Sequence, residues 1–337
     1  MSVTISAPAK INLFLRVLAR EDTGYHGIET LFCSISLADS LTVDRRDGKG
    51  VSIEISGADL GPAEQNLAVQ AANAVLESVG HPFAVHLTLT KRIPVRAGLG
   101  GGSSDAAAAL VATNNLAGDA IPRHELLQIA ARVGSDVPFF VSGAPLALAW
   151  NRGERMLRLP PLPAAPLLLL TPHVSVATSE AYEWIDAARR SAGRRGAVAL
   201  DLEALSGWGD IARMAGNDFE SPVFGRHPEI RAAFEALVRT RPLLCRMSGS
   251  GSTLVALYRS ERDREDAAAM LGRKHGAVIA AETVSGVRSK ECGLGRRRTG
   301  AEHSRVIPSG CEGSLHATLV RDLCSDVNLS DPLLHSG

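Results

Sequence analysis

A glycine-rich segment constrains the fold of this chain more than any other feature. The stretch Pro94-Val-Arg-Ala-Gly-Leu-Gly-Gly-Gly-Ser-Ser-Asp-Ala-Ala107 has glycine at four of the five positions 98–102. Apolar and polar residues alternate over 85–89, which predicts a strand before it. Residues 106–110 are good helix formers and predict a helix after it. The segment therefore connects a strand to a helix, and its glycines allow positive φ and close approach of a ligand.

The start of the predicted helix is an expected anion site. Either Ser103 or Ser104 can cap the helix, whose first N–H groups lie at the positive end of its dipole. We expect the phosphate chain of ATP there. A Walker A loop needs a lysine after the glycines, and a dinucleotide loop needs glycine where Ser103 stands, so neither fits. A flexible glycine linker is the alternative, and the regular structure expected on both sides disfavours it.

Composition restricts the class of protein. The chain has 337 residues, 45% hydrophobic and 21% charged, as expected of about two globular domains. Lysine plus arginine and aspartate plus glutamate both total 36, which disfavours a nucleic-acid partner. We find no signal peptide, no apolar run long enough for a membrane and no C-x-x-C pair among five cysteines. The sequence predicts a cytoplasmic protein with reduced cysteines and no metal site.

Periodicity predicts α+β layers in two domains. The expected strands lie near 11–17 and at 51–55, 85–89, 167–171, 253–258 and 277–283. The expected helices lie at 66–79, 123–133, 179–190, 229–240 and 263–275. A proline-rich segment at 159–166 marks the boundary, giving domains 1–160 and 161–288 with a cleft between them. We expect the tail 289–337 to be poorly ordered; read-through or out-of-frame sequence is the alternative.

Two clusters near the N-terminus are candidate binding residues. In Ala7-Pro-Ala-Lys-Ile-Asn-Leu13, Lys10 and Asn12 share one face of a strand. A solvated strand face is the alternative. In Gly24-Tyr-His, Tyr25 and His26 are suited to stack on and hydrogen-bond a base, or they belong to an ordinary loop with an anchored aromatic.

Two later clusters also carry candidate chemistry. Asp136, in Gly134-Ser-Asp-Val-Pro, is either a general base that takes a hydroxyl proton or a helix N-cap. The residues Ser248, Gly249, Ser250 and Gly251 form a second flexible loop before a strand. This loop either closes over phosphates or only turns the chain.

Together these clusters resemble the GHMP kinase superfamily. Ala7-Pro-Ala-Lys-Ile-Asn-Leu13, Gly24-Tyr-His with Glu29-Thr30, 94–107, Gly134-Ser-Asp-Val-Pro and Met247-Ser-Gly-Ser-Gly occur in the family's order over about 1–288. The resemblance implies an N-terminal domain like the second domain of a small-subunit ribosomal protein, a ferredoxin-like C-terminal domain and a cleft between them. The Gly-Tyr-His and Ala-Lys-Ile-Asn segments narrow it to members whose acceptor carries a cytidine diphosphate group.

The resemblance implies phosphoryl transfer from ATP, accompanied by Mg²⁺, to a hydroxyl of a small molecule. Asp136 would accept the hydroxyl proton, and Lys10 would hold it as a carboxylate. The acceptor would contact Asn12, Tyr25, His26, Thr178 and Tyr182. The ATP phosphates would lie on Pro94, Val95, Arg96, Ala97, Gly98, Leu99, Gly100, Gly101, Gly102, Ser103 and Ser104.

Two departures and two alternatives accompany the resemblance. Asn151, in Asn151-Arg-Gly-Glu154, stands where the family often has glycine, and the tail has no counterpart in the family pattern.

A homoserine or mevalonate type of kinase is one alternative function, but Tyr25, His26 and Tyr182 would then have no base to recognise. A non-catalytic nucleotide-binding homologue is the other, and it predicts the loss of a lysine or aspartate that is present. No obligate protein partner is expected.

Overall fold

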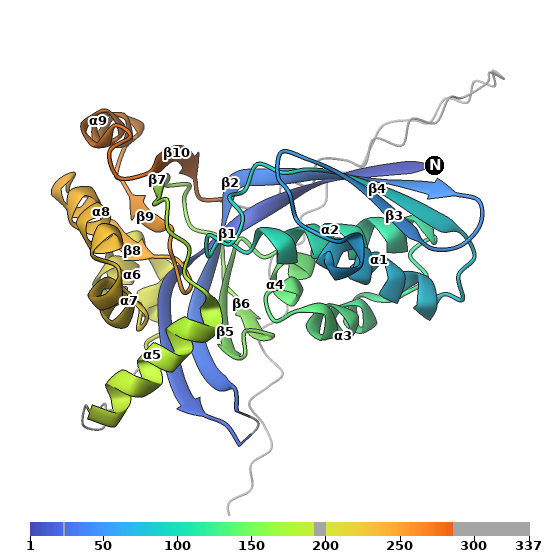
Figure 1. Ribbon diagram of the computed structural model, residues 1–337, viewed down its shortest axis with the longest axis horizontal. Helices are drawn as coiled ribbons and strands as arrows, with labels where there is room; N and C mark the ends of the chain where they lie inside the picture. The colour runs from blue at the N-terminus through green and yellow to red at the C-terminus, as the bar shows by residue number, and fades with distance from the viewer. Residues whose placement is uncertain (23, 192–199, 286–337) are drawn as a thin grey trace, which may run out of the picture. The chain divides into compact units, whose positions relative to one another are not determined.

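The computed structural model describes residues 1–22, 24–191 and 200–285, whose helices and strands are shown in Figure 1. The tail predicted at 289–337 lies outside these residues. Two β-sheets with helices packed on them make up the described part, which confirms the α+β prediction. None of the helices in the described ranges is both long enough and apolar enough to cross a bilayer.

The first sheet is built around two long strands. Its strands are β1 (Ser2–Arg20), β2 (His26–Arg46), β3 (Val51–Ser56), β4 (Ala84–Thr90), β5 (Leu146–Asn151) and β6 (Arg155–Arg158). β1 and β2 pair antiparallel, from Ser2 opposite Asp44 to Arg20 opposite His26. β4 pairs with the second half of β2, and β5 pairs with its first half. The strand β2 thereby joins the region of the sheet that contains β4 to the region that contains β5.

Four helices accompany the first sheet. They are α1 (Leu67–Ser78), α2 (Gly101–Leu116), α3 (Arg123–Val133) and α4 (Val137–Ser142). The sequence predicts the bounds of α3 correctly. It predicts α1 one residue too long at each end, because Asn66 is the N-cap, whose side chain accepts the Ala68 N–H at 2.9 Å, and Val79 is the C-cap.

The second sheet has the strand order β10-β7-β9-β8. Its strands are β7 (Pro166–Thr171), β8 (Leu244–Met247), β9 (Leu254–Leu257) and β10 (Ala277–Glu282). The helices of this half are α5 (Thr178–Ser191), α6 (Trp208–Met214), α7 (Glu220–Arg226), α8 (Pro228–Arg239) and α9 (Glu261–Leu271). The prediction that α9 continues to residue 275 is wrong, because Gly272 takes a positive φ of 54° and ends the helix.

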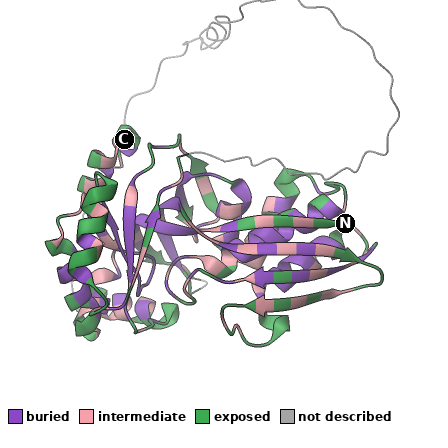
Figure 2. Ribbon diagram, turned by 90° about the horizontal axis from the view of Figure 1, so that it is seen from above, coloured by how far each residue is buried: buried purple, intermediate pink, exposed green. Residues whose placement is uncertain are grey.

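The strand β1 is buried where it approaches the second sheet. Its first residues alternate between exposed and half-buried, whereas residues 9–15 are all buried, as Figure 2 shows. Ile11 and Leu13 share one apolar cluster with Leu167, Leu169 and Val255 of the second sheet. Apolar contacts thus cross the boundary predicted at residue 160, and the boundary itself stays a prediction.

A buried charge cluster holds both ends of the glycine segment. Lys91 Nζ lies 2.5 Å from Asp39 Oδ2 and 2.7 Å from Asp105 Oδ2, and all three side chains are buried. Asp39 Oδ1 also accepts the N–H groups of Arg92 at 2.5 Å and Ile93 at 2.9 Å. Asp39 therefore fixes the entry to the segment, and Lys91 joins that entry to the second turn of α2.

This cluster predicts a pH-dependent stability. Burial raises the pKa of Asp105 from 3.8 to about 7, although Lys91 lowers it, and the nearby Asp39 raises it further. Between about pH 4 and 7 the folded chain keeps a proton that the unfolded chain has lost, so the free energy of unfolding falls as the pH rises. Asp105→Asn should remove this dependence and stabilise the protein at pH 8, measured by urea unfolding from pH 4 to 8.

The control is Asp119→Asn, the same change at an exposed residue outside the cluster. It should keep the wild-type pH dependence of unfolding. If the free energy of unfolding of Asp105→Asn follows that of the wild type at every pH, the Asp105 carboxyl does not cause the pH dependence.

Candidate active site

A cavity of about 610 Å³ brings together residues from both halves of the described chain. The predicted residues that line it are Lys10, Asn12, Tyr25, His26, Gly98, Gly100, Asp136, Thr178, Tyr182, Gly249 and Ser250. The predicted residues that do not line it are Pro94, Val95, Arg96, Ala97, Leu99, Gly101, Gly102, Ser103, Ser104, Ser248 and Gly251. The cavity therefore has a glycine-rich part, an aromatic part and a charged pair.

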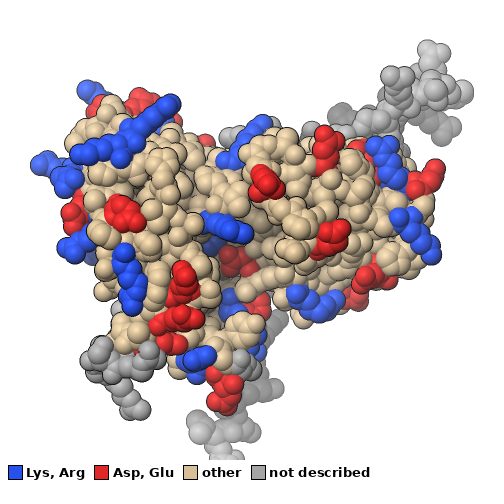
Figure 3. All heavy atoms as spheres, in the orientation of Figure 1, with Lys and Arg blue, Asp and Glu red and all other residues tan. Residues whose placement is uncertain are grey.

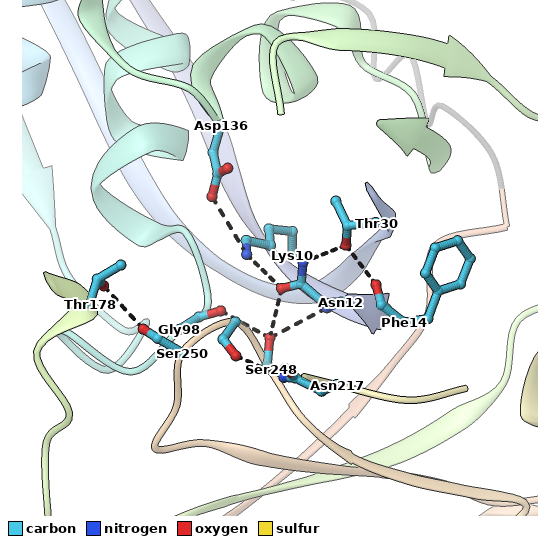
Figure 4. A network of polar contacts seen from close by, with 11 residues as sticks. Lys10, Asn12, Phe14, Thr30, Gly98, Asp136, Thr178, Asn217, Ser248 and Ser250 are labelled. Atoms are coloured by element: carbon cyan, nitrogen blue, oxygen red, sulfur yellow. Dashed lines mark hydrogen bonds and ion pairs between the residues drawn. The ribbon is translucent and has the colours of Figure 1, made fainter. Parts of the chain in front are cut away.

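The charged pair is formed by Lys10 and Asp136. Lys10 Nζ lies 3.5 Å from Asp136 Oδ2 and donates to Asn12 Oδ1 at 2.7 Å (Figure 4). It also lies 5.1 Å from the centre of the Phe32 ring. Lys10 is buried, whereas the Asp136 side chain is 27% exposed. The buried ammonium can stabilise negative charge. The accessible carboxylate next to it can receive a proton.

Irregular pairing of β1 frames Lys10 and Asn12. The register of β1 against β2 shifts between Pro8 and Lys10 and again between Asn12 and Phe14. Such irregularities re-aim side chains and are common next to active sites. The interpretation of a solvated strand face is therefore wrong, because both polar side chains are buried and point to the charged pair.

The amide of Asn12 is held in one orientation. Its Nδ2 donates to Thr30 Oγ1 at 2.7 Å, and Thr30 Oγ1 donates in turn to the Phe14 carbonyl at 2.7 Å. The amide oxygen is thus left to accept from Lys10. Thr30 lies in a segment that the sequence resemblance includes, but its spacing alone gives no sign of this role.

Asp136 does not cap a helix. It precedes α4 at the N-cap position, with φ −85° and ψ −14°, yet its side chain accepts no capping hydrogen bond. The N-cap interpretation is wrong in this respect. The carboxylate is directed to Lys10 and the cavity instead, as Figure 4 shows.

The glycine segment presents backbone to the cavity. Gly98 and Gly100 have φ of 75° and 70°, and α2 begins at Gly101 with Gly100 as its N-cap. The expectation that Ser103 or Ser104 caps the helix is wrong, because both lie inside it. Leu99 is buried and its carbonyl accepts the Lys10 N–H at 3.0 Å, so β1 holds the segment directly.

The second loop, residues 248–251 (the Gly/Ser loop), touches the glycine segment. Ser248 Oγ donates to the Gly98 carbonyl at 2.9 Å, and a side chain at Gly98 would place Cβ 2.2 Å from the Ser248 carbonyl oxygen. Ser250 Oγ lies 3.0 Å from Thr178 Oγ1 at the start of α5. The loop thus contacts both the glycine segment and the start of α5.

In the aromatic part of the cavity, His26 and Tyr25, which are expected to contact a base, have contacts within the protein. His26 stacks on Tyr182 with ring centres 5.0 Å apart, and its Nε2 lies 2.7 Å from Asp186 Oδ1. Tyr25 is 60% exposed and lies under the Arg152 guanidinium at 4.1 Å. Tyr25 and His26 therefore have different partners in this structure, and both line the cavity.

Burial raises the pKa of Tyr182 to about 12, and the charge of Asp136 raises it as well. Its hydroxyl therefore stays protonated at neutral pH and can donate a hydrogen bond. The ring also meets Phe219 edge-on, with centres 5.0 Å apart.

Sequence reasoning missed several residues of the cavity. These are Leu15, Arg20, Gly24, Ile28, Phe32, Ser135, Arg152, Ser179, Glu183, Asp186 and Phe219. Some of them had a usable signal. Gly24, Ser135 and Arg152 lie within motifs recognised in the sequence. Ser179 and Asp186 are three and four residues from Tyr182 on a predicted helix and so share its face. Asn151 keeps its turn although the family often has glycine there, since asparagine tolerates its φ of 65°.

Comparison with known proteins gives the family of this site. Residues 66–144 match the GHMP kinases N terminal domain, and residues 197–278 match the GHMP kinases C terminal domain. A 4-diphosphocytidyl-2-C-methyl-D-erythritol kinase of Solibacter usitatus is 39% identical over 275 residues, covering 80% of this chain and 85% of that relative. The chain belongs to the GHMP kinase family. This membership supports ATP as the phosphoryl donor.

Other GHMP kinases agree. A 4-diphosphocytidyl-2-C-methyl-D-erythritol kinase of Geobacter sulfurreducens is 33% identical, covering 84% of this chain and 99% of the relative. A crystal structure of 4-(cytidine 5'-diphospho)-2C-methyl-D-erythritol kinase matches with TM-score 0.70 and 35% identity, over 83% of this chain and 98% of the other. A homoserine kinase from Cytophaga hutchinsonii, 20% identical with TM-score 0.62 over 85% and 95%, shares the fold. The expected GHMP kinase fold is confirmed.

Two glycines of this GHMP kinase make a matched pair. Gly98→Ala should destabilise the fold by about 1–3 kcal/mol, because φ is 75° and the new Cβ would lie 2.2 Å from the Ser248 carbonyl oxygen. Gly102→Ala should be neutral or stabilise by about 0.5–1 kcal/mol, since it lies in α2 with its nearest neighbour at 3.8 Å. Urea unfolding of both variants measures the difference. Equal effects would contradict the close contact of the two loops.

Proposed function

We propose that this chain transfers the γ-phosphoryl group of ATP to the 2-hydroxyl of 4-diphosphocytidyl-2-C-methyl-D-erythritol. The product is the 2-phosphate, an intermediate of non-mevalonate isoprenoid precursor biosynthesis. The observation that carries the proposal is the Lys10–Asp136 pair, 3.5 Å apart in a cavity lined by glycine backbone and by aromatic residues. Relatives of 39% and 33% identity bear the name of this kinase and support the choice of acceptor.

We assign the phosphates of ATP to the glycine segment, residues 94–104, and to the adjoining Gly/Ser loop. Gly98 and Gly100 line the cavity and lack side chains that would keep a phosphate away from the backbone. The first turn of α2 follows at once, so its N–H groups and dipole favour an anion there. Ala97, Leu99 and Ser104 are buried, so their contribution would be positioning of this backbone.

Asp136 would act as the general base. It takes the proton of the acceptor hydroxyl while that oxygen forms a bond to the γ-phosphorus, and the bond from phosphorus to the bridging oxygen of ADP breaks. Lys10, 3.5 Å away, orients the carboxylate and stabilises the charge on the transferred group. Asn12 keeps the ammonium of Lys10 in place through its amide oxygen.

The aromatic part would recognise the cytosine base. Tyr182 and Tyr25 offer ring faces for stacking, and His26 offers a hydrogen-bonding ring nitrogen. Because His26 stacks on Tyr182 at 5.0 Å, a base could use that face of Tyr182 only after His26 turns aside. Thr178 lies at the start of α5 next to Ser250 and would contact the polar chain of the acceptor.

Mg²⁺ would arrive with ATP. Among the described residues there is no cluster of three histidine, cysteine or acidic side chains suited to a metal. The oxygen donors that line the cavity, such as Asp136, Ser135 and Ser179, suit a hard cation held mainly by phosphate oxygens and water. Bound there, the ion would neutralise charge on the phosphates.

We further propose that the protein is located in the cytoplasm. We also propose that residues 1–160 and 161–288 form its two domains.

The test is phosphorylation of several acceptors by the purified full chain. The protein with ATP and Mg²⁺ is offered 4-diphosphocytidyl-2-C-methyl-D-erythritol, homoserine or mevalonate, and phosphorus NMR follows the products. A new phosphomonoester on the cytidyl acceptor alone is expected. A product on another acceptor would overturn the substrate assignment and with it the roles of Tyr25, His26 and Tyr182. Turnover of none of the three, with ATP bound, would favour a non-catalytic homologue.

Replacing the base gives the sharpest mutational prediction. Asp136→Asn should lower kcat by roughly 10²–10⁴-fold, because an amide cannot accept the hydroxyl proton, while ATP affinity changes little. Asp119→Asn, the same change at an exposed residue outside the cavity, serves as the control and should keep wild-type kcat. Near-normal turnover of Asp136→Asn would remove this residue from the mechanism.

A further inference from the structure

A buried asparagine that neither the motifs nor the cavity lining include connects the parts of the site. Asn217 lies between α6 and α7 and pairs with Leu15 of β1 through an isolated bridge. The Leu15 N–H donates to the Gly216 carbonyl at 2.8 Å, and the Asp218 N–H donates to the Leu15 carbonyl at 3.0 Å. This short segment is thereby fastened to the same strand that carries Lys10 and Asn12.

The side chain of Asn217 makes three hydrogen bonds to backbone. Its Nδ2 donates to the Met247 carbonyl at 2.7 Å and to the Gly249 carbonyl at 2.8 Å. Its Oδ1 accepts the Phe219 N–H at 2.9 Å. One amide hydrogen therefore goes to the end of β8 and the other to the Gly/Ser loop, and the oxygen goes to the segment that carries Phe219. Figure 4 shows Asn217 next to Ser248 of this loop.

These bonds decide which way the loop's peptide groups face. In a trans peptide the C=O and the following N–H point in opposite directions. Because the Gly249 carbonyl is turned to Asn217, the Ser250 N–H is turned away from Asn217, and both Gly249 and Ser250 line the cavity. An N–H group with this direction suits a phosphate oxygen.

Other groups also contact the loop, since Thr178 Oγ1 lies 3.0 Å from Ser250 Oγ and Asn12 Oδ1 lies 3.5 Å from Ser248 Oγ. Ser248 Oγ holds it to the Gly98 carbonyl, and the Ser248 N–H donates to the Thr253 carbonyl at 2.9 Å. Glycine at 249 and 251, with φ of 59° and 99°, makes the unbound loop adaptable. Asn217 restricts that freedom, although it does not line the cavity.

We propose that Asn217 is a positioning residue, which orients the backbone of the Gly/Ser loop for the nucleotide phosphates. The inference rests on the proposed function only in placing phosphates at this loop. Asn217 also supports Phe219, whose ring meets Tyr182 edge-on at 5.0 Å, so one side chain supports both ends of the cavity. The two supports can be tested separately, because Nδ2 of the amide bonds the carbonyls of Met247 and Gly249, whereas Oδ1 bonds the Phe219 N–H.

Asn217→Asp separates the two roles. A carboxylate keeps an oxygen for the Phe219 N–H but loses both donors, and it places negative charge against the carbonyls of Met247 and Gly249. The Gly/Ser loop should lose its orientation, while the aromatic side stays in place. Asn114→Asp is the matched control, because Asn114 is buried and its amide bonds the Ile121 backbone at 2.9 and 3.0 Å, outside the cavity lining.

The experiment measures binding of a non-hydrolysable ATP analogue by calorimetry, together with kcat, KM and melting temperature of the full chain. For Asn217→Asp we expect the Kd of the analogue to rise about tenfold and kcat to fall at least as much, with the KM of the acceptor within about twofold. Asn114→Asp should lower the melting temperature and leave the Kd unchanged. Binding of the analogue is independent of the acceptor, so a wrong acceptor assignment would not affect this result.

A purely structural Asn217 would give the opposite result. If Asn217→Asp lowers the melting temperature as Asn114→Asp does but leaves Kd and kcat within twofold of wild type, the proposal is overturned. If Asn217→Asp does not fold, Ser248→Ala tests the same orientation, because it removes another bond that holds the loop, at 2.9 Å to the Gly98 carbonyl. A Kd increase of about threefold is then expected, and an unchanged Kd overturns the proposal.

Discussion

The pairing of β1 with β2 is the constraint on which the site depends. Two shifts of register enclose the three residues from Lys10 to Asn12, so that two polar side chains are buried where an ordinary strand would bury apolar ones. The same strand bonds the glycine segment through the Lys10 N–H and the Asn217 segment through Leu15. The charged pair, the glycine segment and the Asn217 segment are thus positioned relative to one strand.

The charges that this chain uses are few and local. Figure 3 shows positive and negative side chains interspersed on the face it displays, and the formal net charge is zero. Attraction of a phosphorylated ligand must therefore come from groups at the cavity, which are the backbone of two loops, the start of α2, the buried Lys10 and the lining residues Arg20 and Arg152. Polar groups preorganised in this way cost little to align during reaction, which suits phosphoryl transfer.

The sequence predicted elements that are local in their cause. Helix α3 begins after Pro122 and ends before Gly134 as expected, and the glycine segment connects a strand to a helix. It did not predict β2, because its run 31–35 is buried throughout and shows no alternation. Asn217 gave no signal either, since its partners at Met247 and Gly249 lie 30 and 32 residues away.

The most direct measurement is a crystal structure with a non-hydrolysable ATP analogue and 4-diphosphocytidyl-2-C-methyl-D-erythritol bound together. The account predicts the acceptor's 2-hydroxyl at hydrogen-bond distance from the Asp136 carboxylate, about 2.6–3.2 Å. It also predicts the terminal phosphate against the backbone of Gly98, Gly100 and the Gly/Ser loop. An acceptor hydroxyl directed away from Asp136, or phosphates bound outside the two loops, would contradict it.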